Sequence, residues 1–291
     1  MRQRPPIARA TAAAAILGLA LTGCAQTEEA DSTGNATADA TTCTKDQLTT
    51  LKDGMLTVAT GEPAYPPWVV DDAPQTQQGF ESAVAYAAAE RLGFADSDVV
   101  WTRTTFDTAV APGEKTFDWN LQQYTITPER QQAVDFSSPY YEASQSVITA
   151  AGSSIETATS LADLKDAKLG AAVGSTSLDD AEQIIDPTTP VAVFNDNAAA
   201  VSALQNGQID GIVIDTPSAF YLVSEEIDGG KIVGQLPDTA SGESDAFGIL
   251  LAKGSPLTAC TSWAVDQLRD DGTLADLEAT WLEAGGAPVL K

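Results

Sequence analysis

Apolar and polar positions along residues 51–282 predict strands and helices in alternation. Short apolar runs predict strands at 55–60, 99–103, 168–173, 191–194 and 211–215. Helical spacing places Phe80, Val84, Ala87 and Ala88 on one face of a helix that ends at residues 92–93, and a second helix is predicted over 198–206. Alternation of this kind, without an internal repeat, favours an α/β class with largely parallel sheets.

Two short β-rich segments, 145–150 and 246–251, have the pattern of crossings between two lobes. If they lie side by side, residues 148–244 form a second lobe, inserted into a first lobe of 45–147 plus 245–291, with a hinge and a cleft beneath it. The length alone leaves this open, because roughly 250 residues can fold as one compact sheet or divide into two lobes.

The first residues have the pattern of a secretion signal: Arg2, Arg4 and Arg9 precede an apolar run over 12–21. That run is too short to span a bilayer as a helix. It ends in Leu-Thr-Gly-Cys, which resembles the bacterial lipobox. We therefore expect residues 1–23 to be removed and Cys24 to be diacylated, which would anchor the protein to the outer face of the cell membrane. The alternative is a buried N-terminal helix that ends in a cysteine by chance.

Residues 24–44 are rich in Thr, Ala, Asp, Ser and Gly and contain no aromatic side chain. Such a segment buries too little apolar surface to offset the entropy of ordering it. The segment is predicted to be a flexible tether between the lipid anchor and the folded body.

Composition excludes several classes of function. The chain has 41 acidic against 15 basic residues and a net charge of −26, which makes nucleic acid a poor partner. It has no histidine, so histidine-based triads and imidazole metal sites are excluded, and no cysteine cluster has zinc spacing. We therefore expect neither a metal nor a cofactor.

Cys43 and Cys260 remain as a pair once Cys24 is assigned to lipid. An oxidising compartment favours a disulfide between them, although two separate buried thiols are the alternative. A bridge that closes so long a loop would stabilise the fold by about 5 kcal/mol on the chain-entropy model. It would also place the N-terminal strand and the C-terminal helices in the same lobe.

One stretch of the chain is recognisable. Thr-Ile-Thr-Pro-Glu-Arg at 125–130, followed by Val-Asp-Phe-Ser-Ser-Pro-Tyr-Tyr at 134–141, resembles the bacterial family 3 solute-binding proteins. Further matches in the same order extend the similarity over about 51–282: Gly-Phe-Glu at 79–81, Leu-Ala-Asp-Leu-Lys at 161–165, Gly-Ser-Thr-Ser at 174–177, Gly-Gln-Ile-Asp at 207–210, Asp-Thr-Pro at 215–217 and Asp-Gly-Thr-Leu at 271–274.

This resemblance implies a two-lobed, periplasmic-binding-protein-like (type II) α/β fold with two crossover strands. It also implies an extracytoplasmic receptor of an ABC importer, without enzymatic activity and expected to be monomeric. Such a receptor captures a free amino acid by lobe closure and delivers it to the membrane permease.

The resemblance assigns roles to the residues that would hold the two charged ends of an amino acid. Arg130 would bind the carboxylate with its planar fork, and Thr125 and Thr176 would add hydroxyl donors. Asp215, at a strand end, would receive the ammonium, and Gln123 would offer it a backbone carbonyl. The alternatives are ordinary ones: a surface role for Arg130, and helix capping for Thr176, which has capping-box spacing to Asp179, or for Asp215, which precedes Pro217.

The same resemblance suggests a pocket for the ligand side chain. Tyr65 would stack on it, Phe106 would form the opposite wall, and Glu62 would reach its distal end. The two rings could instead belong to the core, and Glu62 could be a solvated acid. Ala172 and Ile214 make the second-lobe side less polar than a basic-amino-acid site requires, so we expect a neutral polar or modestly sized amino acid. Glu62 points the other way, towards a ligand with a nitrogen at its distal end.

Two other classes of function stay open at this point. Some dehydratases that act on cyclic amino-acid precursors share this architecture, and they need a positioned acid or base. A signalling lipoprotein could use the same cleft as a sensor.

Overall fold

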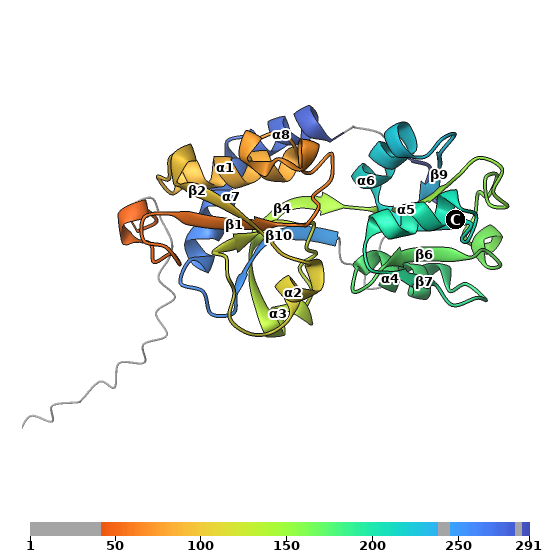
Figure 1. Cartoon of the computed structure of the whole chain (residues 1–291), viewed down its shortest axis with the longest axis horizontal. Helices are drawn as coiled ribbons and strands as arrows, with labels where there is room; N and C mark the ends of the chain where they lie inside the picture. Colours follow the sequence, from red (N-terminus) through yellow and green to blue (C-terminus); the bar gives the residue numbers. More distant parts are fainter. Residues whose placement is uncertain (1–41, 238–244, 283–286) are drawn as a thin grey trace, which may run out of the picture. The chain divides into compact units, whose positions relative to one another are not determined.

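The computed structural model describes residues 42–237, 245–282 and 287–291 (Figure 1). The predicted signal, Cys24 and most of the predicted tether lie outside the described residues. The predicted strands at 55–60, 99–103, 168–173, 191–194 and 211–215 are all present within a residue or two of the expected limits. The chain has a two-lobed α/β fold, as predicted, with one five-stranded sheet in each lobe.

The first sheet has the strand order β2-β1-β3-β10-β4. Its strands are β1 (Leu56–Thr60), β2 (Val99–Arg103), β3 (Trp119–Asn120), β4 (Val134–Ala143) and β10 (Asp245–Ala252). The helices of this lobe are α1 (Phe80–Arg91), α2 (Phe106–Val110), α3 (Arg130–Ala133), α7 (Thr258–Asp270) and α8 (Thr273–Trp281). Helices α1, α7 and α8 contact one another and bury the main hydrophobic core against the sheet (Figure 1).

The second sheet has the strand order β7-β6-β8-β5-β9. Its strands are β5 (Gln145–Thr149), β6 (Leu169–Ala172), β7 (Ala192–Phe194), β8 (Gly211–Asp215) and β9 (Lys231–Gln235). The helices are α4 (Thr176–Asp180), α5 (Asn197–Gln205) and α6 (Thr216–Tyr221). Two core clusters, which contain Val213 and Ile212 respectively, pack around this sheet.

Short 3₁₀ or π turns complete the secondary structure: Lys45–Gln47, Val70–Asp72, Pro74–Thr76, Asp96–Asp98, Leu161–Leu164, Ala181–Ile185 and Leu222–Glu226.

The sheets are mixed rather than largely parallel. In each sheet two consecutive strand pairings are parallel, whereas the strands that lead into and out of the crossings are antiparallel to their neighbours. Segments 145–150 and 246–251 do not pair with each other, so the side-by-side arrangement of these segments is not found. Strand β5 pairs with β8 and β9 in the second sheet, and β10 pairs with β3 and β4 in the first, because the first crossing occurs at Ser144.

The last residues belong with the second sheet, although the expected limits placed all of 245–291 in the first lobe. Leu290 is part of the core around Val213, its N–H bonds the carbonyl of Gln235 at 2.8 Å, and the N–H of Leu161 bonds the carbonyl of Lys291 at 3.1 Å. The chain therefore returns to the second lobe after α8.

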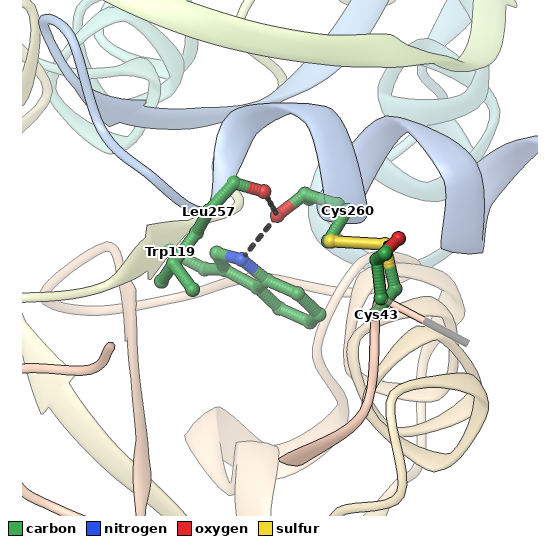
Figure 2. The surroundings of a disulfide bond; sticks show 6 residues. Cys43, Trp119, Leu257 and Cys260 are labelled. Carbon is green, nitrogen blue, oxygen red and sulfur yellow. Dashed lines mark hydrogen bonds between the residues drawn. A yellow bond between two sulfur atoms is a disulfide. The ribbon is translucent and has the colours of Figure 1, made fainter. Parts of the chain in front are cut away.

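Cys43 and Cys260 form a disulfide with an S–S distance of 2.10 Å, which confirms the predicted pair. Figure 2 shows the bridge joining the segment that precedes β1 to helix α7. Trp119 of β3 lies beside it, and its indole N–H bonds the hydroxyl of Thr261 in α7 at 2.8 Å (Figure 2). The N-terminal segment and the C-terminal helices thus share one lobe, as expected.

Candidate functional site

A cavity of about 400 Å³ is lined by loops and element ends of both lobes. This volume lies in the range of small-molecule sites. Seven of the eight residues predicted for the ligand line it: Glu62, Tyr65, Phe106, Gln123, Arg130, Thr176 and Asp215. The eighth, Thr125, lies behind the wall and is only 4% exposed.

Arg130 begins helix α3, and its guanidinium is held from both lobes. Its two terminal nitrogens donate to the carbonyl of Thr125 at 2.8 Å and to the carbonyl of Gly174 at 2.9 Å. The group also lies over the ring of Phe106, 5.2 Å from the ring centre, in a cation–π contact. A guanidinium has five N–H donors, so three remain for an anion in the cavity.

Arg130 also differs from the other arginines of the described chain in its charge balance. Each of the others pairs with a carboxylate at 2.6 Å: Arg91 with Asp271, Arg103 with Asp72, and Arg269 with Asp266. Arg130 forms no such ion pair within the described residues. Burial lowers the pKa of its guanidinium, but arginine keeps its charge in proteins, so a positive charge without a bonded carboxylate faces the cavity.

Thr125 and Thr176 meet across the two lobes, with their hydroxyl oxygens 3.2 Å apart. The alternative role of Thr176, a helix cap suggested by its capping-box spacing to Asp179, does not hold. Ser175 caps helix α4 instead, because its hydroxyl accepts from the N–H of Leu178 at 3.2 Å. Thr176 is therefore the first residue of the helix, and its hydroxyl lies at the cavity wall between the hydroxyl of Thr125 and the carboxylate of Asp245.

Asp215 ends strand β8 at the cavity wall. Its side chain does not cap helix α6, so the capping alternative does not hold. Instead its carboxylate accepts from the amide of Gln145 at 3.0 Å. Burial, followed by the nearby charge of Asp245, raises the pKa of Asp215 to about 7.

Gln123 is fixed at the wall by a residue whose role the sequence did not suggest. Its backbone is in the left-handed region, with a φ of 51°, and its N–H donates to the carboxylate of Glu81 at 2.7 Å. The side-chain amide of Gln123 and the hydroxyl of Tyr140 donate to the same carboxylate. Glu81 is 1% exposed, and this burial raises its pKa to about 7 although the three donors oppose the shift.

The residues predicted for the side-chain pocket sit at different depths. Glu62 is exposed at the cavity edge, whereas Tyr65 is partly buried, and burial together with nearby carboxylates raises the pKa of its phenol. Phe106 stacks on Tyr124, with ring centres 4.8 Å apart, in addition to its contact with Arg130. Phe106 is therefore both part of a small core cluster and part of the cavity wall.

Trp68 is a wall residue that the sequence analysis did not single out. Its indole N–H donates to the hydroxyl of Ser218 at 2.8 Å, which joins the first-lobe loop to helix α6 of the second lobe. The ring itself packs edge-on against Phe80, Tyr141 and Phe247. The Tyr-Pro-Pro-Trp run at 65–68 carries the only hint, since an aromatic side chain in a loop has to be buried somewhere.

Two features are absent from the described part of the chain. No cluster of three or more cysteine and acidic side chains there could hold a metal ion. Nor does any helix in that part have the length and apolar character to cross a bilayer.

Comparison with known proteins decides the family. Residues 56–284 match the model of the bacterial extracellular solute-binding proteins, family 3. The chain belongs to this family. Among its family 3 relatives, the L-cystine-binding protein of Escherichia coli is 29% identical over 79% of this chain and 82% of its own length. The L-arginine-binding protein of Pseudomonas aeruginosa is 28% identical over 75% and 84%.

Solved structures agree with this assignment. An ancestral arginine-binding protein bound to arginine superposes with a TM-score of 0.65 at 30% identity, over 79% of this chain and 98% of its own. An ancestral amino-acid-binding protein described as a precursor of cyclohexadienyl dehydratase superposes with a TM-score of 0.62 at 28% identity, over 79% and 95%.

Proposed function

We propose that this solute-binding protein captures a free amino acid in the cavity between its lobes. Arg130 binds the α-carboxylate with Thr125 and Thr176 as neighbouring hydroxyls, and Asp215 with Gln123 receives the α-ammonium. One observation carries the proposal: an arginine without a bonded carboxylate and a strand-end aspartate line the same 400 Å³ cavity from opposite lobes. A zwitterion supplies both missing charges, and a buried charge needs a partner.

Binding and lobe closure are linked in this proposal. The ligand contacts the first lobe through Arg130 and the second through Asp215, so it makes both sets of contacts only when the lobes are together. It stabilises that arrangement by the difference in affinity between the two states, and a partner can recognise the resulting shape.

The partner we propose is the permease of an ABC importer, with Cys24 as the lipid anchor that keeps the receptor at the outer face of the membrane. The relatives named above bind amino acids, and the lipobox at 21–24 supports the anchor. Incorporation of a labelled fatty acid into the full-length protein, and its loss in Cys24→Ala, tests the anchor.

The charges of the cavity favour a ligand with a positive distal end over the neutral one expected from sequence. Four carboxylates line the cavity, those of Glu62, Asp107, Asp196 and Asp215, against the single guanidinium of Arg130. After the zwitterion has neutralised Arg130 and Asp215, three acids still face the side chain, although Asp196 also caps α5. L-arginine and L-lysine are therefore the first candidates.

A thermal-shift screen of the twenty amino acids tests the proposed function. Basic amino acids should raise the melting temperature most, because a ligand that binds only the native state stabilises it by mass action. The matched controls are agmatine, which is arginine without its carboxylate, and the α-keto analogue, which lacks the ammonium. Neither should bind measurably. Stabilisation by either analogue to the same extent as by L-arginine would contradict the proposal that both the α-carboxylate and the α-ammonium are recognised.

Asp215→Asn should weaken amino-acid binding by about 2 kcal/mol, roughly 30-fold, because an amide keeps the shape but not the charge.

The pH dependence of amino-acid affinity has a defined sign. The carboxyl of Asp215 has a pKa of about 7 and must lose its proton to meet an ammonium, so affinity falls roughly tenfold for each pH unit below 7. Calorimetry from pH 5.5 to 8 should show this slope in the wild type and not in the variant. An identical slope in both would refute the assignment of Asp215.

A dehydratase remains the second candidate, because the carboxyl of Asp215 has a pKa near 7 and a structural neighbour is described as a dehydratase precursor. A general acid or base works best with such a pKa. Incubation with arogenate and prephenate decides between them, since a receptor leaves both compounds unchanged.

A further inference from the structure

Behind the cavity wall, one buried amide connects three side chains. Gln145, the first residue of β5, is 3% exposed. Its side-chain nitrogen donates to Asp215 at 3.0 Å and to Asp245 at 2.9 Å, and its oxygen accepts from the hydroxyl of Ser177 at 2.7 Å. A carboxamide has two N–H donors and one carbonyl, so every polar group of this side chain is used. Gln145 cannot turn without breaking bonds to Asp215, Asp245 and Ser177.

Asp245 lies where the chain returns to the first lobe. It is the first residue of β10, pairs with Ala143 at the end of β4, and is 4% exposed. Burial raises the pKa of its carboxyl, whereas hydrogen bonds from Gln145 and from the hydroxyls of Thr176 and Thr125 oppose this. Asp245 does not line the cavity. It contacts Thr176 of the second lobe, which lines the cavity, and Thr125 of the first lobe, which lies behind the cavity wall.

The charges around the two aspartates come from several elements. Asp245 is the largest source of negative charge acting on Asp215, and Glu81 acts in the same direction. The titratable groups that face the pair from neighbouring elements are Glu81 of α1, Arg130 of α3, Tyr140 and Tyr141 of β4, and Asp179 and Asp180 of α4. Arg130 is the one cation among these groups. A second cation, such as a ligand ammonium, would therefore be attracted by both aspartates.

We propose that Asp245 is a positioning residue of the ligand site, which acts through Gln145 to fix the Asp215 carboxylate and places a second negative charge behind the ammonium subsite. The inference rests on the proposed function of the cavity. It explains why an acid is buried at the crossing with a hydrogen bond from Gln145 at 2.9 Å but without a bonded cation among the described residues, an arrangement that costs stability unless a ligand compensates it.

Carboxyl NMR of the ligand-free, ¹³C-aspartate-labelled protein tests the connection to Asp215. The signal of Asp215 is assigned by its loss in Asp215→Asn. In Asp245→Asn its titration midpoint should move to lower pH, because a neighbouring negative charge is removed. Gln145→Met should move it to higher pH, because a donor that favours the ionised form is lost. These opposite directions keep the test decisive even if one variant does not fold.

Asp118→Asn is the matched control. Asp118 is also a buried aspartate, 6% exposed, and accepts from the N–H groups of Leu51 and Thr57, but it lies outside the cavity lining. Its replacement should lower stability and leave the midpoint of Asp215 unchanged. An Asp215 midpoint that is the same in wild type, Asp245→Asn and Gln145→Met would overturn the role of Asp245.

Calorimetry at pH 8 with the amino acid that gives the largest thermal shift completes the test. Asp245→Asn should bind it roughly tenfold more weakly than the wild type, and Asp118→Asn should bind it equally well. If the wild type binds none of the twenty amino acids, the proposed function fails and the role of Asp245 in a ligand site fails with it. If the wild type binds and Asp245→Asn binds as tightly, only the role of Asp245 is overturned.

Discussion

Replacement of Arg130 by alanine should reduce amino-acid affinity by about 3–5 kcal/mol, which is roughly 150- to 5,000-fold. The loss is large because the ligand carboxylate would be buried without its charged partner. The three guanidinium N–H groups that do not bond Thr125 or Gly174 would be missing as well. Isothermal titration calorimetry with the amino acid that gives the largest thermal shift measures this directly.

Two further variants separate the role of the guanidinium fork from that of charge and of the fold. Arg130→Lys keeps a positive charge but loses the planar fork, so its affinity should lie between those of wild type and alanine. Arg91→Ala removes an exposed arginine that pairs with Asp271, and it should leave affinity unchanged and stability within about 1 kcal/mol. Wild-type affinity in a folded Arg130→Ala variant would show that the carboxylate binds elsewhere.

Removal of the disulfide should have the largest effect on stability. The double variant Cys43→Ser/Cys260→Ser should lose about 5 kcal/mol of unfolding free energy, because the bridge closes a loop with a sequence separation of 217 residues and restricts the unfolded chain. Urea unfolding of both proteins, followed by tryptophan fluorescence, gives the difference.

A reducing agent provides the control for this comparison. A reducing agent should destabilise the wild type and leave the double variant unaffected. Amino-acid affinity at 20 °C should be the same in the oxidised wild type and in the double variant, because neither position 43 nor position 260 lines the cavity. Equal midpoints in urea for wild type and double variant would contradict a stabilising role for the bridge.

The parts of the fold that sequence predicted well are those set by local patterns. The strand at 211–215 is an unbroken apolar run bounded by Gly211 and an acid, and the helix from Phe80 begins at the predicted residue and ends within two residues of the predicted limit, although it is buried on more than the predicted face. The disulfide followed from counting cysteines. Seven of the eight predicted site residues line the cavity. They could be predicted because the motifs around Thr125, Thr176 and Asp215 resemble those of family 3.

The parts that sequence missed depend on contacts between distant segments. Gln145 and Asp245 are 100 residues apart, and neither has a local pattern that indicates a shared hydrogen bond. An acid at the start of an otherwise apolar strand was the only available signal. The pairing of β5 and β10 with strands of different sheets likewise depends on tertiary packing rather than on their own sequences.

The capping alternative for Thr176 at helix α4 fails for a simpler reason. Ser175 and Thr176 are adjacent hydroxyl residues with similar capping preference, so sequence could not fix the helix start to within one residue. The consequence for the site is favourable, since Ser175 takes the capping bond and leaves Thr176 beside Thr125.

A crystal structure of the protein with the amino acid that stabilises it most tests directly whether Arg130 and Asp215 bind the two charged ends of the ligand. The account predicts the ligand carboxylate within hydrogen-bond distance of the guanidinium of Arg130, and the ligand ammonium within hydrogen-bond distance of the carboxylate of Asp215. A bound amino acid that contacts neither of these side chains would contradict it.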